Sequence, residues 1–152
     1  MTDQAVLEVV KNHFSTMQEA MAEITSKGLW PTTYISSPSP ELPVHWHDCA
    51  MEGFLISGNT YILNEKNERV DMSAGDKLVL PAGSLHAEGT ISEGDNVAYI
   101  VGLAEKRPFP HALQLLDPAA YPKADLLTLD PDFAAAFFAA LQEAAPPAPP
   151  IG

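Results

Sequence analysis

Short runs of alternating or apolar residues, separated by turn-forming residues, fill the middle of the chain from Trp30 to Ala104. A period of two is typical of strands, because successive side chains point to opposite faces. The runs predict strands at residues 30–35, 43–47, 52–56, 60–64, 69–72, 77–80, 85–88 and 96–103. Gly58-Asn59 and residues 65–68 are typical of hairpin turns. The pattern therefore predicts a mainly β domain.

The N-terminal stretch follows a helical period instead. Its apolar residues fall at alternating steps of three and four, at Leu7, Val10, Phe14, Met17, Met21 and Ile24. This stripe predicts an amphipathic helix over residues 3–27, capped by Thr2 or Asp3 and ended by Gly28 in a left-handed conformation. The stripe is too short for a coiled coil. We expect it to pack on its own domain, with dimerisation through it as the alternative.

Beyond Ala104 the chain changes character again. Prolines make a long helix unfavourable before Asp130, at positions Pro108, Pro110, Pro118 and Pro122. Asp130 as a cap and Pro131 in the first turn predict a C-terminal helix. The single domain thus divides into an N-terminal helix (1–28), a β core (29–104), a surface-crossing loop (105–129), a C-terminal helix (130–145) and a tail (146–152).

Charge and cysteine content limit the partners and the compartment. The chain has 20 acidic and 8 basic residues, a formal net charge of −12, and no basic cluster. Such a charge repels phosphate backbones and anionic membranes, so we expect neither nucleic acid nor a membrane as a partner. No apolar run approaches the length that spans a bilayer, and the N-terminus does not resemble a signal peptide. Cys49 is the single cysteine, which excludes an intrachain disulfide and predicts a cytoplasmic protein.

The candidate chemistry lies in two blocks that contain histidine. The first block is HWHDCAMEGFLISG, in which a strand places His45 and His47 on one face. The second block is GDKLVLPAGSLH, in which His86 follows a Pro-x-Gly turn. Paired imidazoles suit a transition-metal ion such as iron, zinc, manganese, nickel or copper. His86 reaches the same ion only if the sheet brings the second block across from the first.

The two blocks resemble the paired signature of the cupin superfamily. The first motif of that family is His-x-His, followed by a glutamate and a later glycine, and Gly75, Pro81, Gly83 and His86 match the second. The resemblance spans residues 42–103. It implies a small antiparallel jelly-roll barrel with a metal ion inside its mouth.

The resemblance also implies that Glu52 joins the three histidines as a metal ligand. Glu52 lies five residues after His47 but only six before Gly58, one fewer than many cupins show. If the strand is registered from Gly58, Met51 takes the ligand place and Glu52 turns away, because a slip of one residue exchanges the faces. Ser39 and Thr90 also stand where the family usually has glycine and asparagine. The two ligand sets, with and without Glu52, stay open at this point.

Further candidates surround these ligands. Glu88 lies two residues beyond His86 and shares its face on a regular strand, as a partner of the ligands, a proton-transfer group or a carboxylate at the rim. Candidates for lining an apolar pocket over the metal, with the hydrophobic core as the alternative place, are Met51, Phe54, Tyr61 and Tyr99.

The run from Glu52-Gly53-Phe54 to Gly58 looks like that of iron-dependent cupin dioxygenases, which cleave carbon–carbon bonds in diketones or hydroxyacetophenones. The likeness implies an Fe(II) dioxygenase acting on a small keto or enol compound. One alternative is a cupin isomerase or lyase with zinc, manganese or nickel, because the same ligands accept several metals. Another is a module that senses a small molecule without turnover. We also expect a homodimer that covers a sheet edge.

Overall fold

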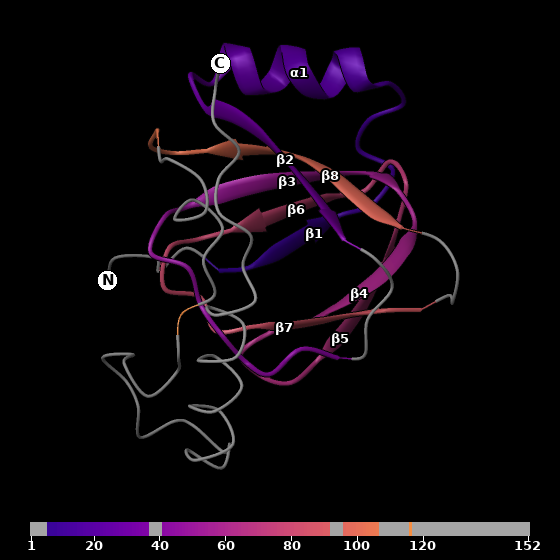
Figure 1. Cartoon of the computed structure of the whole chain (residues 1–152), viewed down its shortest axis with the longest axis vertical. Coiled ribbons are helices and arrows are strands. Elements are labelled where there is room, and N and C mark those ends of the chain that lie inside the picture. The colour runs from indigo at the N-terminus through magenta and orange to yellow at the C-terminus, as the bar shows by residue number, and fades with distance from the viewer. Residues whose placement is uncertain (1–5, 37–40, 92–95, 107–115, 117–152) are drawn as a thin grey trace, which may run out of the picture.

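The computed structural model describes residues 6–36, 41–91, 96–106 and 116. These residues form a five-stranded and a three-stranded antiparallel sheet, with helix α1 (Met17–Ser26) over the outer face of the larger sheet (Figure 1). The order in the larger sheet is β1 (Glu8–Val10), β6 (Lys77–Leu80), β3 (Met51–Ser57), β8 (Val97–Leu103), β2 (Trp30–Ser36). The order in the smaller sheet is β5 (Arg69–Ser73), β4 (Asn59–Leu63), β7 (Ala87–Thr90). The predicted mainly β class is confirmed, although the strands stay in two facing sheets instead of closing into one barrel.

Alternation along β3 separates two apolar layers. Met51 and Leu55 belong to the core cluster between the sheets, whereas Phe54 belongs to a second cluster with Ala20 and Ile24 of α1. The period-two alternation of a strand explains this division, because neighbouring residues of β3 face opposite sides of the sheet. The same strand therefore serves the interior on one face and the helix on the other.

The predicted N-terminal helix is wrong in its first half. Residues 8–10 form strand β1 at the edge of the larger sheet, where Val9 pairs with Leu78 and packs on the inner core. Asn12 then adopts a positive φ of 50°, a conformation that does not continue a right-handed helix. The stripe is not one packed face: α1 buries Ala20 and Ile24, whereas Met17 and Met21, which the stripe includes, are exposed.

Helix α1 starts later, at a cap that its sequence encodes. The Thr16 side chain accepts a hydrogen bond from the backbone N–H of Glu19 at 3.1 Å, and the Glu19 carboxylate accepts one from Ser15 N–H at 2.7 Å. This arrangement is close to a capping box, which satisfies backbone donors at a helix start. At the other end, Gly28 has the left-handed conformation expected of it, with φ of 67°.

The other predicted strands agree with the structure within two residues, except at the histidine blocks. Gly58, with φ of 89°, makes the tight connection between β3 and β4, and a Cβ there would lie 2.7 Å from the carbonyl oxygen of Asn96. Within the predicted strand at 43–47, only His45 and Trp46 form isolated bridges, to His86 and Leu116, and β7 begins only at Ala87.

The predicted helix over 130–145, the tail over 146–152 and most of the loop over 105–129 lie outside the described residues. Leu116 is described, and it pairs with Trp46 in an isolated bridge. Within the described part of the chain, no helix is long and apolar enough to cross a membrane.

Candidate metal centre

The two histidine blocks are joined directly through their backbones. His45 N–H donates to the His86 carbonyl oxygen at 2.9 Å, and His86 N–H donates back to the His45 carbonyl oxygen at 3.0 Å. Gly83 N–H donates to the carbonyl oxygen of His47 at 2.8 Å. The turn at Gly83, where φ is 78°, thus folds the second block across from the first, which is the arrangement that a shared ion needs.

The three imidazoles gather into one buried group. Ring centroids are 4.4 Å apart for His45 and His86, 5.2 Å for His45 and His47, and 5.1 Å for His47 and His86. One potential ligand atom from each ring lies within 4.8 Å of the other two. The exposed fractions of these residues are 0%, 7% and 1% for His45, His47 and His86. The three histidines are therefore placed to hold a metal ion.

Backbone carbonyls fix the orientation of two of these rings. The Nδ1 atoms of His45 and His86 each lie 2.8 Å from a carbonyl oxygen, that of Pro43 and that of Ser84. A carbonyl oxygen only accepts, so Nδ1 must carry the proton and Nε2 keeps its lone pair. Both Nε2 atoms are buried and have no hydrogen-bond partner. An imidazole whose one nitrogen donates to a carbonyl while the other is left open is the arrangement of a metal ligand.

Burial keeps these rings neutral, as metal binding requires. Burial lowers the pKa of His45 to about 4, against the opposing effect of the Pro43 carbonyl. Burial, together with His45 and His47, holds the pKa of His86 well below its usual range. At neutral pH both rings therefore present lone pairs without any need to release a proton.

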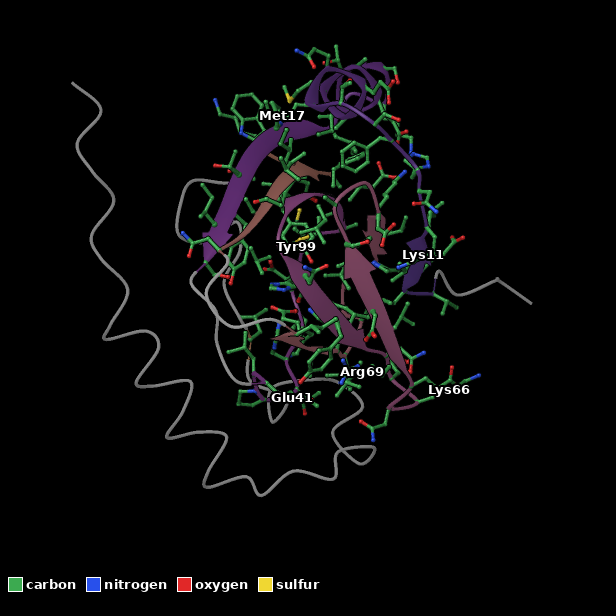
Figure 2. All side chains as sticks on the ribbon, turned by 90° about the vertical axis from the view of Figure 1, so that its right-hand side faces the viewer. Lys11, Met17, Glu41, Lys66, Arg69 and Tyr99 are labelled. Atoms are coloured by element: carbon green, nitrogen blue, oxygen red, sulfur yellow. The ribbon has the colours of Figure 1, made fainter. Side chains whose placement is uncertain are left out.

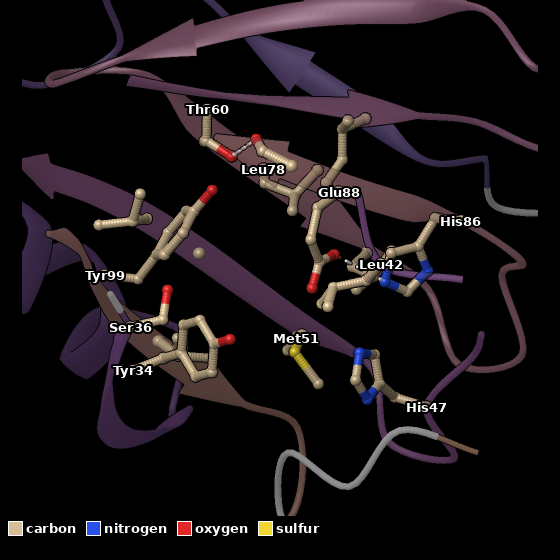
Figure 3. A pocket seen from close by; sticks show the side chains of 16 residues that line it. Tyr34, Ser36, Leu42, His47, Met51, Thr60, Leu78, His86, Glu88 and Tyr99 are labelled. Carbon is tan, nitrogen blue, oxygen red and sulfur yellow. Dashed lines mark hydrogen bonds and ion pairs between the residues drawn. The ribbon is translucent and has the colours of Figure 1, made fainter. Parts of the chain in front are cut away.

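Glu88 of β7 lies beside the histidines, as its spacing from His86 predicts. Its carboxylate oxygens are 3.6 Å from Nε2 of His45 and 3.5 Å from Nε2 of His86. In Figure 3 the carboxylate points toward the His86 ring. Burial raises the pKa of Glu88, and His47 opposes that rise. Because both histidines are neutral, these two approaches are not ion pairs.

Glu52 does not join the histidines. Its Oε1 atom lies 2.7 Å from Nζ of Lys27 and 2.8 Å from Nζ of Lys77, on the face of β3 that α1 covers. The two lysines outweigh burial, which would raise the pKa of Glu52, so that this pKa is lowered. The register counted from Gly58 therefore holds, and Met51 faces inward in its place.

A pocket opens between the two sheets above the histidines and has about 770 Å³ of space, part of it open to solvent. Met51, Tyr99 and Glu88 line it together with His47 and His86. Figure 3 places the Tyr99 ring at the far end of this pocket from the histidines.

Two of the pocket candidates lie elsewhere. Phe54 packs under α1, on the other face of β3, with the ring of Phe14 edge-on at 5.5 Å between centroids. Tyr61 donates a hydrogen bond to Glu41 at 2.8 Å, and the Arg69 guanidinium lies over its ring at 4.0 Å. On both strands, the residues directly before and after these two face the interior. A shift of one residue in the predicted register therefore explains both wrong predictions.

Sequence reasoning missed other residues that line the pocket. The polar ones are Tyr34, Ser36 and Thr60. Tyr34 stands directly opposite Tyr99 in the pairing of β2 with β8, and the ring centroids are 6.3 Å apart. The alternation of residues 30–35 places Tyr34 on one face with Thr32, but which face lines the pocket depends on the long-range pairing.

No protein-family model and no curated protein matches the chain. Among solved structures, it is similar to a DUF861-family protein from Thermotoga maritima, with 15% identity, a TM-score of 0.46 and coverage of 64% of this chain and 98% of that one. A salicylate 1,2-dioxygenase from Pseudoaminobacter salicylatoxidans has 18% identity, a TM-score of 0.44 and coverage of 65% and 35%. The polyketide cyclase RemF from Streptomyces resistomycificus has 21% identity, a TM-score of 0.42 and coverage of 51% and 56%. At these identities and scores, the chemistry of the site has to be derived from its own residues.

Proposed function

We propose that this protein is a metal-dependent enzyme of the cupin type, an Fe(II) dioxygenase that acts on a small keto or enol compound. The observation that carries the proposal is the pair of buried Nε2 atoms of His45 and His86, both without a partner and both beside His47. Leaving two such atoms unpaired in the interior is unfavourable unless something else binds them. A divalent cation satisfies both at once.

Three imidazoles leave coordination positions open on most transition metals. A bound Fe(II) ion would supply sites for dioxygen and for a pair of substrate oxygens, the chemistry of histidine-ligated oxygenases. The protein's own contribution is to hold the rings and to exclude bulk water. Apolar side chains of Leu78, Leu80 and Val101 line the pocket and limit water near the ligands.

The pocket favours an uncharged substrate. Among the described residues, no lysine or arginine lines it. Lys66 and Arg69 lie on the outside of the domain, whereas Tyr99 lies in its interior (Figure 2). The hydroxyl group of Tyr34 lines the pocket and can form hydrogen bonds without charge, whereas that of Thr60 already donates to the carbonyl oxygen of Gly89 at 2.6 Å. A small neutral molecule with a carbonyl or enol group fits this lining better than a phosphate or a polycarboxylate.

A non-redox isomerase or lyase is the second candidate, since neutral imidazoles also bind zinc, manganese and nickel. Oxygen uptake separates the two reactions. The metal-free protein is loaded anaerobically with Fe(II), Zn(II), Mn(II) or Ni(II), and a β-diketone and a hydroxyacetophenone are offered as probes. We expect oxygen consumption only with Fe(II), and none in the His47→Ala variant, which we expect to retain no metal.

Other outcomes of that assay point elsewhere. Conversion of a probe without oxygen, in the Zn(II), Mn(II) or Ni(II) form, would replace the dioxygenase by the isomerase or lyase. Saturable binding of a probe without conversion in any metal form would favour the sensing module. Full metal occupancy in the His47→Ala variant would contradict the proposed site.

A further inference from the structure

A divalent ion held only by three neutral imidazoles would bring two uncompensated positive charges into the interior. Burying net charge is unfavourable unless an opposite charge lies close by. Glu52, the carboxylate that the first histidine block offers, is already neutralised by Lys27 and Lys77 on the other side of β3. A compensating carboxylate would therefore have to come from another position.

Glu88 is the carboxylate at the histidines, and its contacts need a cation to explain them. Distances of 3.6 Å and 3.5 Å to His45 Nε2 and His86 Nε2 are too long for hydrogen bonds. Neither Nε2 has a proton to donate, because each Nδ1 faces a backbone carbonyl oxygen. Lone pairs on nitrogen thus face the oxygens of Glu88, and only a positive centre between them, a proton or a metal ion, makes this arrangement favourable.

The same distances agree with shared coordination. Two ligand atoms that each lie about 2.1 Å from one ion, at a tetrahedral angle, are separated by about 3.4 Å. The separations of the Glu88 oxygens from the two Nε2 atoms, 3.6 Å and 3.5 Å, are close to this value. The spacing therefore accommodates one ion that both histidines and the carboxylate contact.

The backbone of Glu88 is held in place on both sides. Glu88 pairs with Ile62 of β4, and the carbonyl oxygen of Glu88 accepts a hydrogen bond from Leu42 N–H at 2.8 Å. Strand alternation then directs the Glu88 side chain to the same face as that of His86, two residues earlier. This pairing keeps one carboxylate oxygen of Glu88 beside His45 and the other beside His86.

We propose that Glu88 is the carboxylate ligand of this metal centre. The site then has three histidines and one glutamate, with the glutamate supplied by the strand after the last histidine instead of by the first histidine block. The proposal rests on the metal site of the proposed function, but not on the reaction.

Cobalt binding by the full chain tests this assignment. Co(II) is titrated into metal-free wild type, Glu88→Gln and Glu52→Gln, and the affinity and the visible d–d spectrum are recorded. We expect Glu88→Gln to weaken binding by at least about tenfold, since even the outer partners of metal ligands contribute that much, and to change the spectrum. Glu52→Gln is the matched control, and we expect it to keep the wild-type affinity and spectrum.

The stability of the metal-free proteins separates a lost ligand from a damaged fold. The side-chain amide that Glu88→Gln introduces can donate to a histidine Nε2, so we expect this apo variant to melt at or above the wild-type temperature while its metal-induced rise in Tm is smaller. Wild-type affinity and spectrum in Glu88→Gln would overturn the assignment, as would a loss of affinity in Glu52→Gln. A wild type that binds cobalt through Glu88 but consumes no oxygen with iron would refute only the dioxygenase.

Discussion

His45 and His86 stand opposite each other in an antiparallel backbone bridge, and in both residues Nδ1 lies 2.8 Å from the carbonyl oxygen two positions earlier in the chain. The two segments thus repeat one local arrangement, in which the backbone fixes the proton on Nδ1 and directs Nε2 inward. The pairing explains how residues 41 positions apart in the sequence converge on one point.

Met51 occupies the inward position of β3 from which a carboxylate would reach the histidines, and it is 8% exposed. We expect Met51→Glu to lower the stability of the metal-free protein by about 2 kcal/mol, because it buries a carboxylate without a partner. Zn(II) should restore this loss by binding the new carboxylate. Differential scanning fluorimetry with and without Zn(II) measures both effects.

The control for this prediction is Met51→Gln, which has nearly the same shape but no charge. It should show a smaller gain in Tm on zinc addition than Met51→Glu. If zinc raises the Tm of Met51→Glu no more than that of the wild type, Met51 does not face the ion.

Lys77 links the helix to the sheet from a buried position. Its side chain is 6% exposed, forms an ion pair with Glu23 of α1 and lies 2.8 Å from Glu52 of β3. We expect Lys77→Met to reduce the free energy of unfolding by about 3 kcal/mol, because two partly buried carboxylates lose their buried cation and keep only the exposed Lys27. Urea denaturation measures the change.

Lys27 provides the matched comparison, since it contacts the same two carboxylates but is 44% exposed. Solvent screens an exposed pair, so Lys27→Met should lose less than about 1 kcal/mol. Equal losses in the two variants would show that burial of Lys77 does not govern the strength of this network.

The lowered pKa of Glu23 predicts part of the dependence of folding stability on pH. Burial alone would raise the pKa of Glu23, but hydrogen bonds from Lys77, His13 and Lys27 lower it from 4.5 to about 2. Because the pKa of Glu23 is lower in the folded state, the unfolded state binds more protons on acidification. The stability that the Glu23 carboxylate contributes is therefore complete above pH 4.5 and is lost as the pH falls toward 2. Urea titrations of wild type and Glu23→Gln between these limits measure it. We expect the wild type to lose more stability on acidification than the variant, and parallel curves would contradict the role of Glu23.

The sequence identified the histidines of the site because each block is a local pattern, and the resemblance to cupins implied that the two blocks meet. A strand places His45 and His47 on one face, and the turn at Gly83 returns the second block, so only the pairing of the two blocks was left to the fold. The β strands around them followed from their alternation in the same way. Both features depend on neighbours in sequence, which is where patterns carry most information.

Features that depend on long-range pairing could not be predicted in the same way. The apolar spacing before residue 16 fitted a helix, yet Val9 gains more by joining the edge of the sheet opposite Leu78. The outward direction of Glu52 depended on a register that only pairing with β6 and β8 fixes, and the contact of Tyr34 with Tyr99 depended on the pairing of β2 with β8. The motif Thr16-x-x-Glu19 was a local signal for the true helix start, and the longer stripe concealed it.

Main-chain hydrogen bonds, formed as the sheets assemble, set the spacing of the imidazoles. An ion arriving later meets a preorganised cage, and its departure breaks no β pairing. If the proposed site binds a metal, the folded protein could exchange one divalent ion for another, and metal supply and relative affinity, more than folding, would decide which ion the site contains.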